Sequence, residues 1–253
     1  MKRMVIISDL HCGHLVGLTP PKWHYQNDGK LYKNQKELWK FYAAAIDSLK
    51  PIDILVVNGD AIDGKGYMAG GTDQKTTNRL EQVDMAVECI EHAEAKTIRM
   101  TYGTPYHTGR DEDWEAIIAD KVDAKIESHA FFDIDGTVFD IKHKVGASTV
   151  PHGRLTSVMR EKLWNTVWAS RDQQKKANVL IRSHVHYHQY GGDPYFLAMT
   201  TPALQGYGSK FGARQCSGVV DIGLIYFDID KDGYEWNQIL AELPQQKAPV
   251  EFL

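Results

Sequence analysis

Residues 4–11 have the sequence MVIISDLH, and this stretch decides the fold that we predict. The apolar, largely β-branched run from Val5 to Ile7 is typical of a buried β-strand. The run ends abruptly at Asp9 and His11, whose side chains are both common metal ligands. Because side chains of an extended segment alternate between its two sides, Asp9 and His11 point in the same direction. The stretch therefore predicts a buried strand with two potential ligands at its carboxyl end.

The first half of the chain alternates between strand patterns and helix patterns. Buried-type strands are predicted over residues 52–57 and near residues 97–101. Apolar residues at helical spacing predict helices over residues 38–49, 80–90 and 114–118. The order of strands and helices is typical of a sheet whose parallel strands are joined by helical crossovers.

The pattern changes from about residue 131. Asp135 and Gly136 lie between two short apolar runs and predict a hairpin turn. A helix is expected near residues 155–168. Further strands, which we expect to be mostly antiparallel, are predicted near residues 179–181, 195–200, 219–228 and 234–240. Since no repeat, low-complexity tract or linker divides the chain, we expect one α/β domain over residues 1–253, built of two packed sheets flanked by helices.

The composition is that of an ordinary globular protein, with 43% hydrophobic and 25% charged residues. The net charge of −4 gives no overall basic surface for nucleic acid. Three widely spaced cysteines argue against a disulfide framework and a thiolate zinc site, and they suit a reducing cytoplasm. No apolar run is long enough for a signal peptide or a membrane span. We therefore expect a soluble, cytoplasmic protein with no membrane partner.

Residues of the metal-ligand types follow the later strands as well. Asp60 follows the second strand, His107 lies shortly after the third, and His143 closes a hairpin strand. His184 and His186 follow a later strand. Adjacent strands deliver their carboxyl ends to one edge of a sheet, so these side chains are expected to converge. Carboxylates and imidazoles together suit a pair of divalent ions that clamp a phosphoryl group.

In this order, the motifs resemble those of the calcineurin-like metallophosphoesterase superfamily. The family pattern is D-x-H, G-D-x-x-D, G-N-H, a lone histidine at a strand end, and G-H-x-H. The matching segments are Asp9 to His11, Gly59 to Asp63, Gly103 to His107, His143, and Ser183 to His186. In size and motif order the chain resembles the small DNA-repair-nuclease branch. The resemblance implies a four-layer α/β/β/α sandwich of two mixed sheets flanked by helices.

The resemblance also implies a dinuclear metal site. Its ligands would be Asp9, His11 and His186 on the first metal, Asp60 between the two, and His143 and His184 on the second. The cofactors would be two divalent metal ions, with Mn²⁺ as the first expectation and Fe, Zn, Ni or Mg as alternatives.

Two further residues receive catalytic roles from the resemblance. His107 would contact the phosphate and assist the leaving group, and Asp63 would orient a metal ligand. A hydroxide that bridges the metals would attack phosphorus in line, without a covalent enzyme intermediate.

The chain departs from the family in the third motif, where no asparagine is present. The hydroxyl of Thr104, a water molecule or His107 would then complete the second metal, and we include Thr104 among the candidate ligands. The strand-end histidine also has a rival, since His152 would be the ligand if the hairpin register differed. We expect His143, because residues 138–142 have the pattern of a strand directed at the site.

Candidate substrate contacts are less specific. Arg79 and Arg110 carry guanidinium groups that match phosphate oxygens, and Arg79 opens a predicted helix. His14 lies just beyond the first motif, close enough to touch a substrate.

The predicted function is metal-dependent hydrolysis of a phosphoester, by a phosphodiesterase or nuclease-like enzyme. The alternatives are a phosphomonoesterase that acts on nucleotides or phosphoproteins, and a non-catalytic scaffold like the retromer scaffold subunits that share the fold. The expected partner is a phosphoester substrate, with a nucleotide or DNA as candidates. The sequence leaves the oligomeric state open, with a homodimer as one option.

Overall fold

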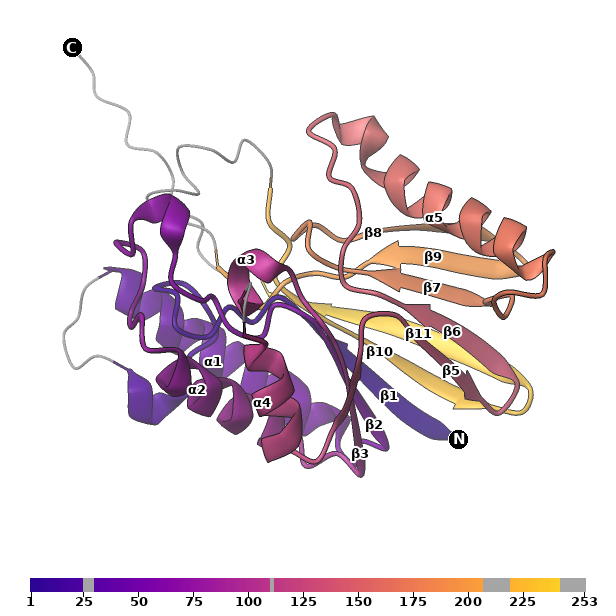
Figure 1. Ribbon diagram of the computed structural model, residues 1–253. Coiled ribbons are helices and arrows are strands. Elements are labelled where there is room, and N and C mark those ends of the chain that lie inside the picture. The colour runs from indigo at the N-terminus through magenta and orange to yellow at the C-terminus, as the bar shows by residue number, and fades with distance from the viewer. Residues whose placement is uncertain (25–29, 110–111, 207–218, 242–253) are drawn as a thin grey trace, which may run out of the picture.

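The computed structural model describes residues 1–24, 30–109, 112–206 and 219–241. Two β-sheets pack face to face, and helices cover the outer side of each sheet (Figure 1). The predicted four-layer α/β/β/α arrangement of two mixed sheets is confirmed. No helix in these ranges is both long enough and apolar enough to cross a lipid bilayer.

The first sheet has six strands in the described ranges, in the order β11-β10-β1-β2-β3-β4. Their bounds are Lys2–Ile7 (β1), Ile54–Asn58 (β2), Thr97–Thr101 (β3), Lys125–Glu127 (β4), Gly223–Asp230 (β10) and Gly233–Leu240 (β11). Strands β1 to β4 run parallel, while β10 runs antiparallel to both β1 and β11. The crossover helices are α1 (Lys30–Leu49), α2 (Arg79–Glu91) and α4 (Trp114–Lys121). The β-α alternation predicted for the first half is confirmed.

The second sheet has the order β5-β6-β7-β9-β8 in the described ranges. Its strands are Ala130–Ile134 (β5), Thr137–Ile141 (β6), Val179–Arg182 (β7), Gln189–Asp193 (β8) and Phe196–Thr200 (β9). Helix α5 (Arg154–Ala169) packs on its outer face through Val158, against Leu180 and Ala198. Strands β6, β7 and β9 run parallel, so the prediction of antiparallel pairing is wrong for these three.

Short helices lie in the connections between these elements. They are η1 (Pro21–Trp23), η2 (Tyr67–Ala69), α3 (Pro105–Thr108) and η3 (Pro151–Gly153). Of these, η2 and α3 lie near each other on the side of the molecule where the strands of the first sheet end (Figure 1).

Strand β1 is buried on both faces, which explains its continuous apolar sequence. Val5 and Ile7 face the helices, whereas Met4 and Ile6 face the second sheet. This alternation follows from the two-residue period of a strand. The helix-side core and the inter-sheet core therefore meet along β1.

The inter-sheet core is centred on a pair of aromatic rings. Phe139 on β6 and Phe227 on β10 are fully buried, with ring centroids 5.1 Å apart and ring planes at 84°. This edge-to-face geometry is favourable for aromatic pairs. The pair ties the two sheets together.

Replacing Phe139 with alanine should lower the free energy of unfolding by about 3–5 kcal/mol, because a large buried side chain is removed and leaves a cavity. Urea denaturation followed by circular dichroism measures this change. Tyr195→Ala is the control, since Tyr195 is 84% exposed. A Phe139→Ala protein as stable as the control would contradict the placement of this core.

Candidate metal centre

The side chains with metal-ligand chemistry come from segments that follow five strands, β1, β2, β3, β6 and β7. They form three clusters in the described part of the chain, and within each cluster the ligand atoms lie within 4.8 Å of one another. The clusters are Asp9–His11–His186, His11–Asp60–His107 and Asp60–His143–His184. His11 and Asp60 each belong to two clusters, so the three clusters form one continuous group that draws on both sheets.

The backbone of these turns adopts a conformation that is uncommon for residues other than glycine. Five of the clustered residues have positive φ angles: Asp9 (51°), His11 (45°), Asp60 (51°), His184 (73°) and His186 (55°). This region costs about 1–2 kcal/mol per residue, although aspartate and histidine adopt it more readily than most. Hydrogen bonds between the turns after β1 and β2 hold it, from Asp9 N to the Gly59 carbonyl and from His11 N to the Asp60 carbonyl, both 3.0 Å. Strain of this kind is concentrated at functional sites.

A chain of buried hydroxyl and amide groups lies directly behind the ligands. Thr101 Oγ1 donates to Asn58 Oδ1 at 2.6 Å, and Asn58 Nδ2 donates to Ser183 Oγ at 2.6 Å. Ser183 Oγ and Ser8 Oγ each lie 2.7 Å from Thr201 Oγ1. All five side chains are at most 1% exposed. The chain joins strand ends of both sheets and includes Ser183, which stands where the family pattern has glycine.

The Asp9 carboxylate is fully buried and only partly satisfied. Its Oδ1 accepts no hydrogen bond from the described residues, although the Nε2 atoms of three imidazoles surround it. These belong to His186 at 3.2 Å, and to His11 and His143 at 4.0 Å each. Burial raises the pKa of Asp9, but the positive charges of His186 and His143 outweigh this effect and lower it to about 2. The arrangement is a buried anion that lacks a directed partner.

His143 and His107 supply positive charge to the buried carboxylates. Burial opposes the charged form of His143, yet Asp60 and Asp9 raise its pKa to about 10. His107 behaves alike: burial lowers its pKa, and Asp63 with Asp60 raises it to about 9. Divalent cations would supply the same positive charge, and neutral imidazoles and ionised carboxylates are the forms that bind them. The unsatisfied Asp9 oxygen and this donor set therefore fit a site for divalent metal ions.

Asp63 fixes the orientation of two histidine rings. Its Oδ1 accepts from His11 Nδ1 at 2.8 Å, and its backbone carbonyl lies 2.9 Å from His107 Nδ1. The Nε2 atom of each ring is thereby left to face the clusters. Burial, followed by the neighbouring charge of His107, lowers the pKa of His11 to about 4, so this ring is neutral as a metal ligand must be.

The departure in the third motif produces a different contact from the one the family pattern implies. Thr104 precedes the short helix α3, which begins at Pro105. Its backbone N–H donates to Asp60 Oδ1 at 2.6 Å, and its hydroxyl donates to the same oxygen at 3.1 Å. Thr104 thus lies against the carboxylate shared by two clusters, and its hydroxyl is engaged there.

Glu115 is a site residue that sequence reasoning missed. It is fully buried in the first turn of α4, where Oε1 accepts from Ala61 N at 2.8 Å and Oε2 accepts from Gly103 N at 2.6 Å. Burial, reinforced by the nearby Asp60, raises its pKa to about 7. Glu115 fastens the Asp60 turn to the loop that carries Thr104. The sequence offered only an acidic residue at a helix start, which is common at exposed positions too.

The remaining candidates belong to none of the three clusters of the described chain. His152 is exposed in η3 and belongs to none of the three clusters. His14 is buried, and its Nδ1 accepts from Val16 N at 3.1 Å. Arg79 lines a cavity beside His107. Arg110 lies outside the described residues.

Comparison with known proteins adds likeness at the level of overall structure. No protein-family model matches the sequence, and no curated protein matches it either. Among solved structures, the chain is similar to a novel archaeal phosphodiesterase, with a TM-score of 0.49 and 13% identity over 94% of this chain and 99% of that one. It is also similar to a predicted phosphoesterase from Streptococcus pneumoniae, with a TM-score of 0.43 and 10% identity over 94% and 89% of the two chains. Vps29 from Entamoeba histolytica complexed with Zn²⁺ matches with a TM-score of 0.45 and 12% identity over 94% and 98%.

These likenesses are too distant to carry an argument about activity. The arrangement of the sheets and the order of the ligand motifs along their strand ends are the features that identify the fold. The described structure is an α/β/β/α sandwich of two mixed sheets, and the order of its ligand-type motifs resembles that of the calcineurin-like metallophosphoesterases. The third motif is the segment that differs from the pattern of that family, and Glu115 Oε2 accepts a hydrogen bond within it from Gly103 N.

Glu115→Gln should weaken Mn²⁺ binding by about tenfold or more, because an amide cannot accept from both backbone N–H groups and partners of this kind hold the ligand turns in place. Isothermal titration calorimetry, with Mn²⁺ added to protein whose metals have been removed by a chelator, measures the affinity for Mn²⁺. The control is Glu91→Gln, a substitution at an exposed position on α2. Equal Mn²⁺ affinity in the two variants would show that Glu115 does not position the site.

Proposed function

We propose that this protein is a metal-dependent phosphodiesterase with a dinuclear site. The observation that carries the proposal is the position of Asp60, which belongs both to the His143–His184 cluster and to the His11–His107 cluster. A carboxylate shared in this way suits a ligand between two cations. Asp9, His11 and His186 would hold one ion, and His143 and His184 would hold the other.

When bound, a pair of divalent ions polarises the phosphoryl oxygens and activates water as the nucleophile. The residues of the chain would bind and orient the substrate around them. His107 would hold a proton at Nε2 and deliver it to the departing oxygen, since its Nδ1 is occupied by the Asp63 carbonyl. With a side chain 19% exposed, His107 can reach a substrate.

The role of Asp63 in this proposal is to orient rather than to react. Its carboxylate keeps the His11 ring in place, and its carbonyl does the same for His107. Gln74 Nε2, 2.5 Å from Asp63 Oδ2, holds the second carboxylate oxygen. A single residue thus couples a proposed metal ligand to the proposed proton donor.

A diester is the favoured substrate because a cavity opens beside His107. The departing oxygen of a diester carries an organic substituent, and this cavity would have room for it. The alternatives, a phosphomonoesterase and a non-catalytic scaffold, are outcomes of the test below.

Purified protein should hydrolyse bis-p-nitrophenyl phosphate faster than p-nitrophenyl phosphate once Mn²⁺, Ni²⁺, Zn²⁺ or Mg²⁺ is added after chelation. His107→Ala should lower kcat for the diester by about 100-fold or more, because it removes a general acid. Absorbance of p-nitrophenolate measures both. His152→Ala is the control, since His152 lies apart from the clusters.

Preference for the monoester would favour a phosphomonoesterase. A folded protein that turns over neither ester with any of the four metals would refute the proposed activity and favour the scaffold.

Adding Mn²⁺ to protein whose metals have been removed by a chelator should raise its melting temperature. A ligand that binds only the folded state stabilises that state, by about 2.7 kcal/mol when the free ligand concentration is 100 times Kd. Asp60→Asn should remove most of this increase, because both proposed ions lose a charged ligand. Differential scanning fluorimetry with and without Mn²⁺ measures the shift. Asp120→Asn, on the exposed side of α4, is the control. An Asp60→Asn protein with the full Mn²⁺-dependent shift would argue against Asp60 as a ligand.

A further inference from the structure

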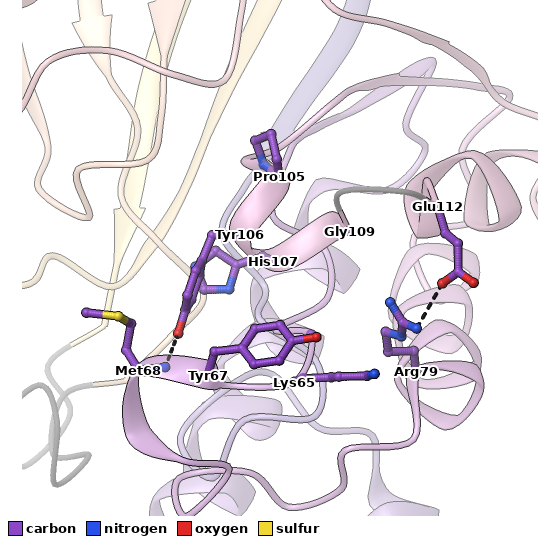
Figure 2. A pocket seen from close by; sticks show the side chains of 10 residues that line it. Lys65, Tyr67, Met68, Arg79, Pro105, Tyr106, His107, Gly109 and Glu112 are labelled. Carbon is purple, nitrogen blue, oxygen red and sulfur yellow. Dashed lines mark hydrogen bonds and ion pairs between the residues drawn. The ribbon is translucent and has the colours of Figure 1, made fainter.

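A cavity of about 570 Å³ lies beside His107, which is the one residue that its lining shares with the three ligand clusters of the described chain. Its walls come from the loop that contains η2, from α3, and from the start of α2 (Figure 2). The cavity is of the size that takes a small organic ligand. Because His107 forms part of its wall, a molecule in this cavity would lie next to the proposed proton donor.

One part of the cavity is aromatic. Tyr67 is 67% exposed and lies along the cavity in Figure 2. The ring of Tyr106 packs against the edge of His107, with centroids 4.7 Å apart and planes at 88°. The Tyr106 hydroxyl accepts from Met68 N at 2.8 Å, which ties η2 to α3 and fixes this wall. Flat, accessible rings of this kind bind the faces of planar ligands such as nucleobases.

The adjoining part of the cavity is cationic. Lys65 is exposed there, and it has no hydrogen-bond or ion-pair partner in the described part of the chain. Arg79 lies close by in Figure 2, with its guanidinium 4.4 Å from the centroid of the Trp114 ring. Its Nη2 pairs with Glu112 Oε2 at 2.8 Å. The lining residues therefore include two cationic side chains and one carboxylate, which leaves a net positive charge for an anionic group.

Arg79 is paired with Glu112, a partner that an anionic ligand can displace. Glu112 is 59% exposed, and an exposed ion pair contributes little to stability. A phosphate group binds a guanidinium through two hydrogen bonds and would compete for the same position. Stacking on Trp114 would keep Arg79 in place during the exchange.

From these features we infer that the cavity is a nucleotide-binding subsite, which takes the leaving-group side of the phosphodiester substrate. The inference rests on the proposed function of the metal centre. The base lies against Tyr67, and the phosphate of the leaving nucleotide lies at Lys65 and Arg79. The substrate class is thereby narrowed to phosphodiesters with a nucleotide as leaving group.

The test is equilibrium binding of adenosine 5′-monophosphate to the full chain in the presence of a chelator, by isothermal titration. Adenosine and ribose 5-phosphate are the fragment probes. The wild-type protein should bind the nucleotide at least about threefold more tightly than either fragment, because only the nucleotide reaches both parts of the cavity. Nucleotide binding no tighter than that of the fragments would overturn the inference.

Three variants separate the two parts of the cavity. Lys65→Gln should weaken binding of the nucleotide by about threefold and leave adenosine binding unchanged. Tyr67→Leu should weaken both by about fivefold or more, because base stacking is lost. Glu112→Gln should tighten nucleotide binding by about threefold, because the competing carboxylate is removed. Lys231→Gln and Tyr195→Leu, at exposed turn positions outside the cavity, are the matched controls.

A nucleotide affinity that is the same in all three variants as in the wild type would overturn the inference. Adenosine 5′-monophosphate should also inhibit hydrolysis of bis-p-nitrophenyl phosphate competitively, and non-competitive inhibition would place the nucleotide elsewhere. The binding experiment needs neither metal nor turnover. Absence of phosphoesterase activity would therefore refute the proposed function without changing the binding result, and loss of selective binding would refute the subsite while the activity stands.

Discussion

The structure depends on the burial of negative charge where the strands end. Asp9 and Asp60 are at most 1% exposed, and an isolated carboxylate in such a position is strongly unfavourable. Neighbouring imidazoles compensate for the buried negative charge. The carboxylates of Asp60 and Asp9 raise the pKa of His143, which shows that they stabilise a positive charge beside them. Two carboxylates buried at this depth, with one oxygen of Asp9 unsatisfied, suit the binding of cations. The two sheets must meet at one edge for the compensation to occur.

The surrounding structure keeps these groups in place although two features are unfavourable in free energy, namely the burial of charge and the strained backbone of the turns. The left-handed residues that carry the ligands are fixed by backbone hydrogen bonds between neighbouring turns. Behind them, the chain from Thr101 to Ser8 connects strand ends of both sheets through buried hydroxyl and amide groups. Glu115 adds a third connection by joining the Asp60 turn to the loop of the third motif. Positions of the ligand atoms are therefore set by groups that would touch neither metal nor substrate.

Sequence patterns predicted the elements whose residues have a clear period. Strand β1 and helices α2 and α5 were expected within a few residues of their observed bounds. Strand β8 was missed, because Gly191 and Gly192 interrupt the alternation that marks a strand. The short helix α3 was missed as well, since four residues are too few to show helical spacing. Antiparallel pairing was predicted in this part of the chain, but β6, β7 and β9 pair in parallel, because residue patterns do not encode the direction of a neighbouring strand.

By itself, the sequence determined the chemistry at the strand ends. Apolar runs followed by Asp9, Asp60 and His184 are local patterns, so they could be recognised without coordinates. Tertiary structure alone decided which of these groups meet, because contacts between residues 9 and 186 or 60 and 143 depend on how two sheets pack. It also decided what Glu115 contacts and which residues line the cavity beside His107. A buried glutamate, an exposed tyrosine and an unpaired lysine look ordinary in a sequence, and their significance comes only from what the fold places beside them.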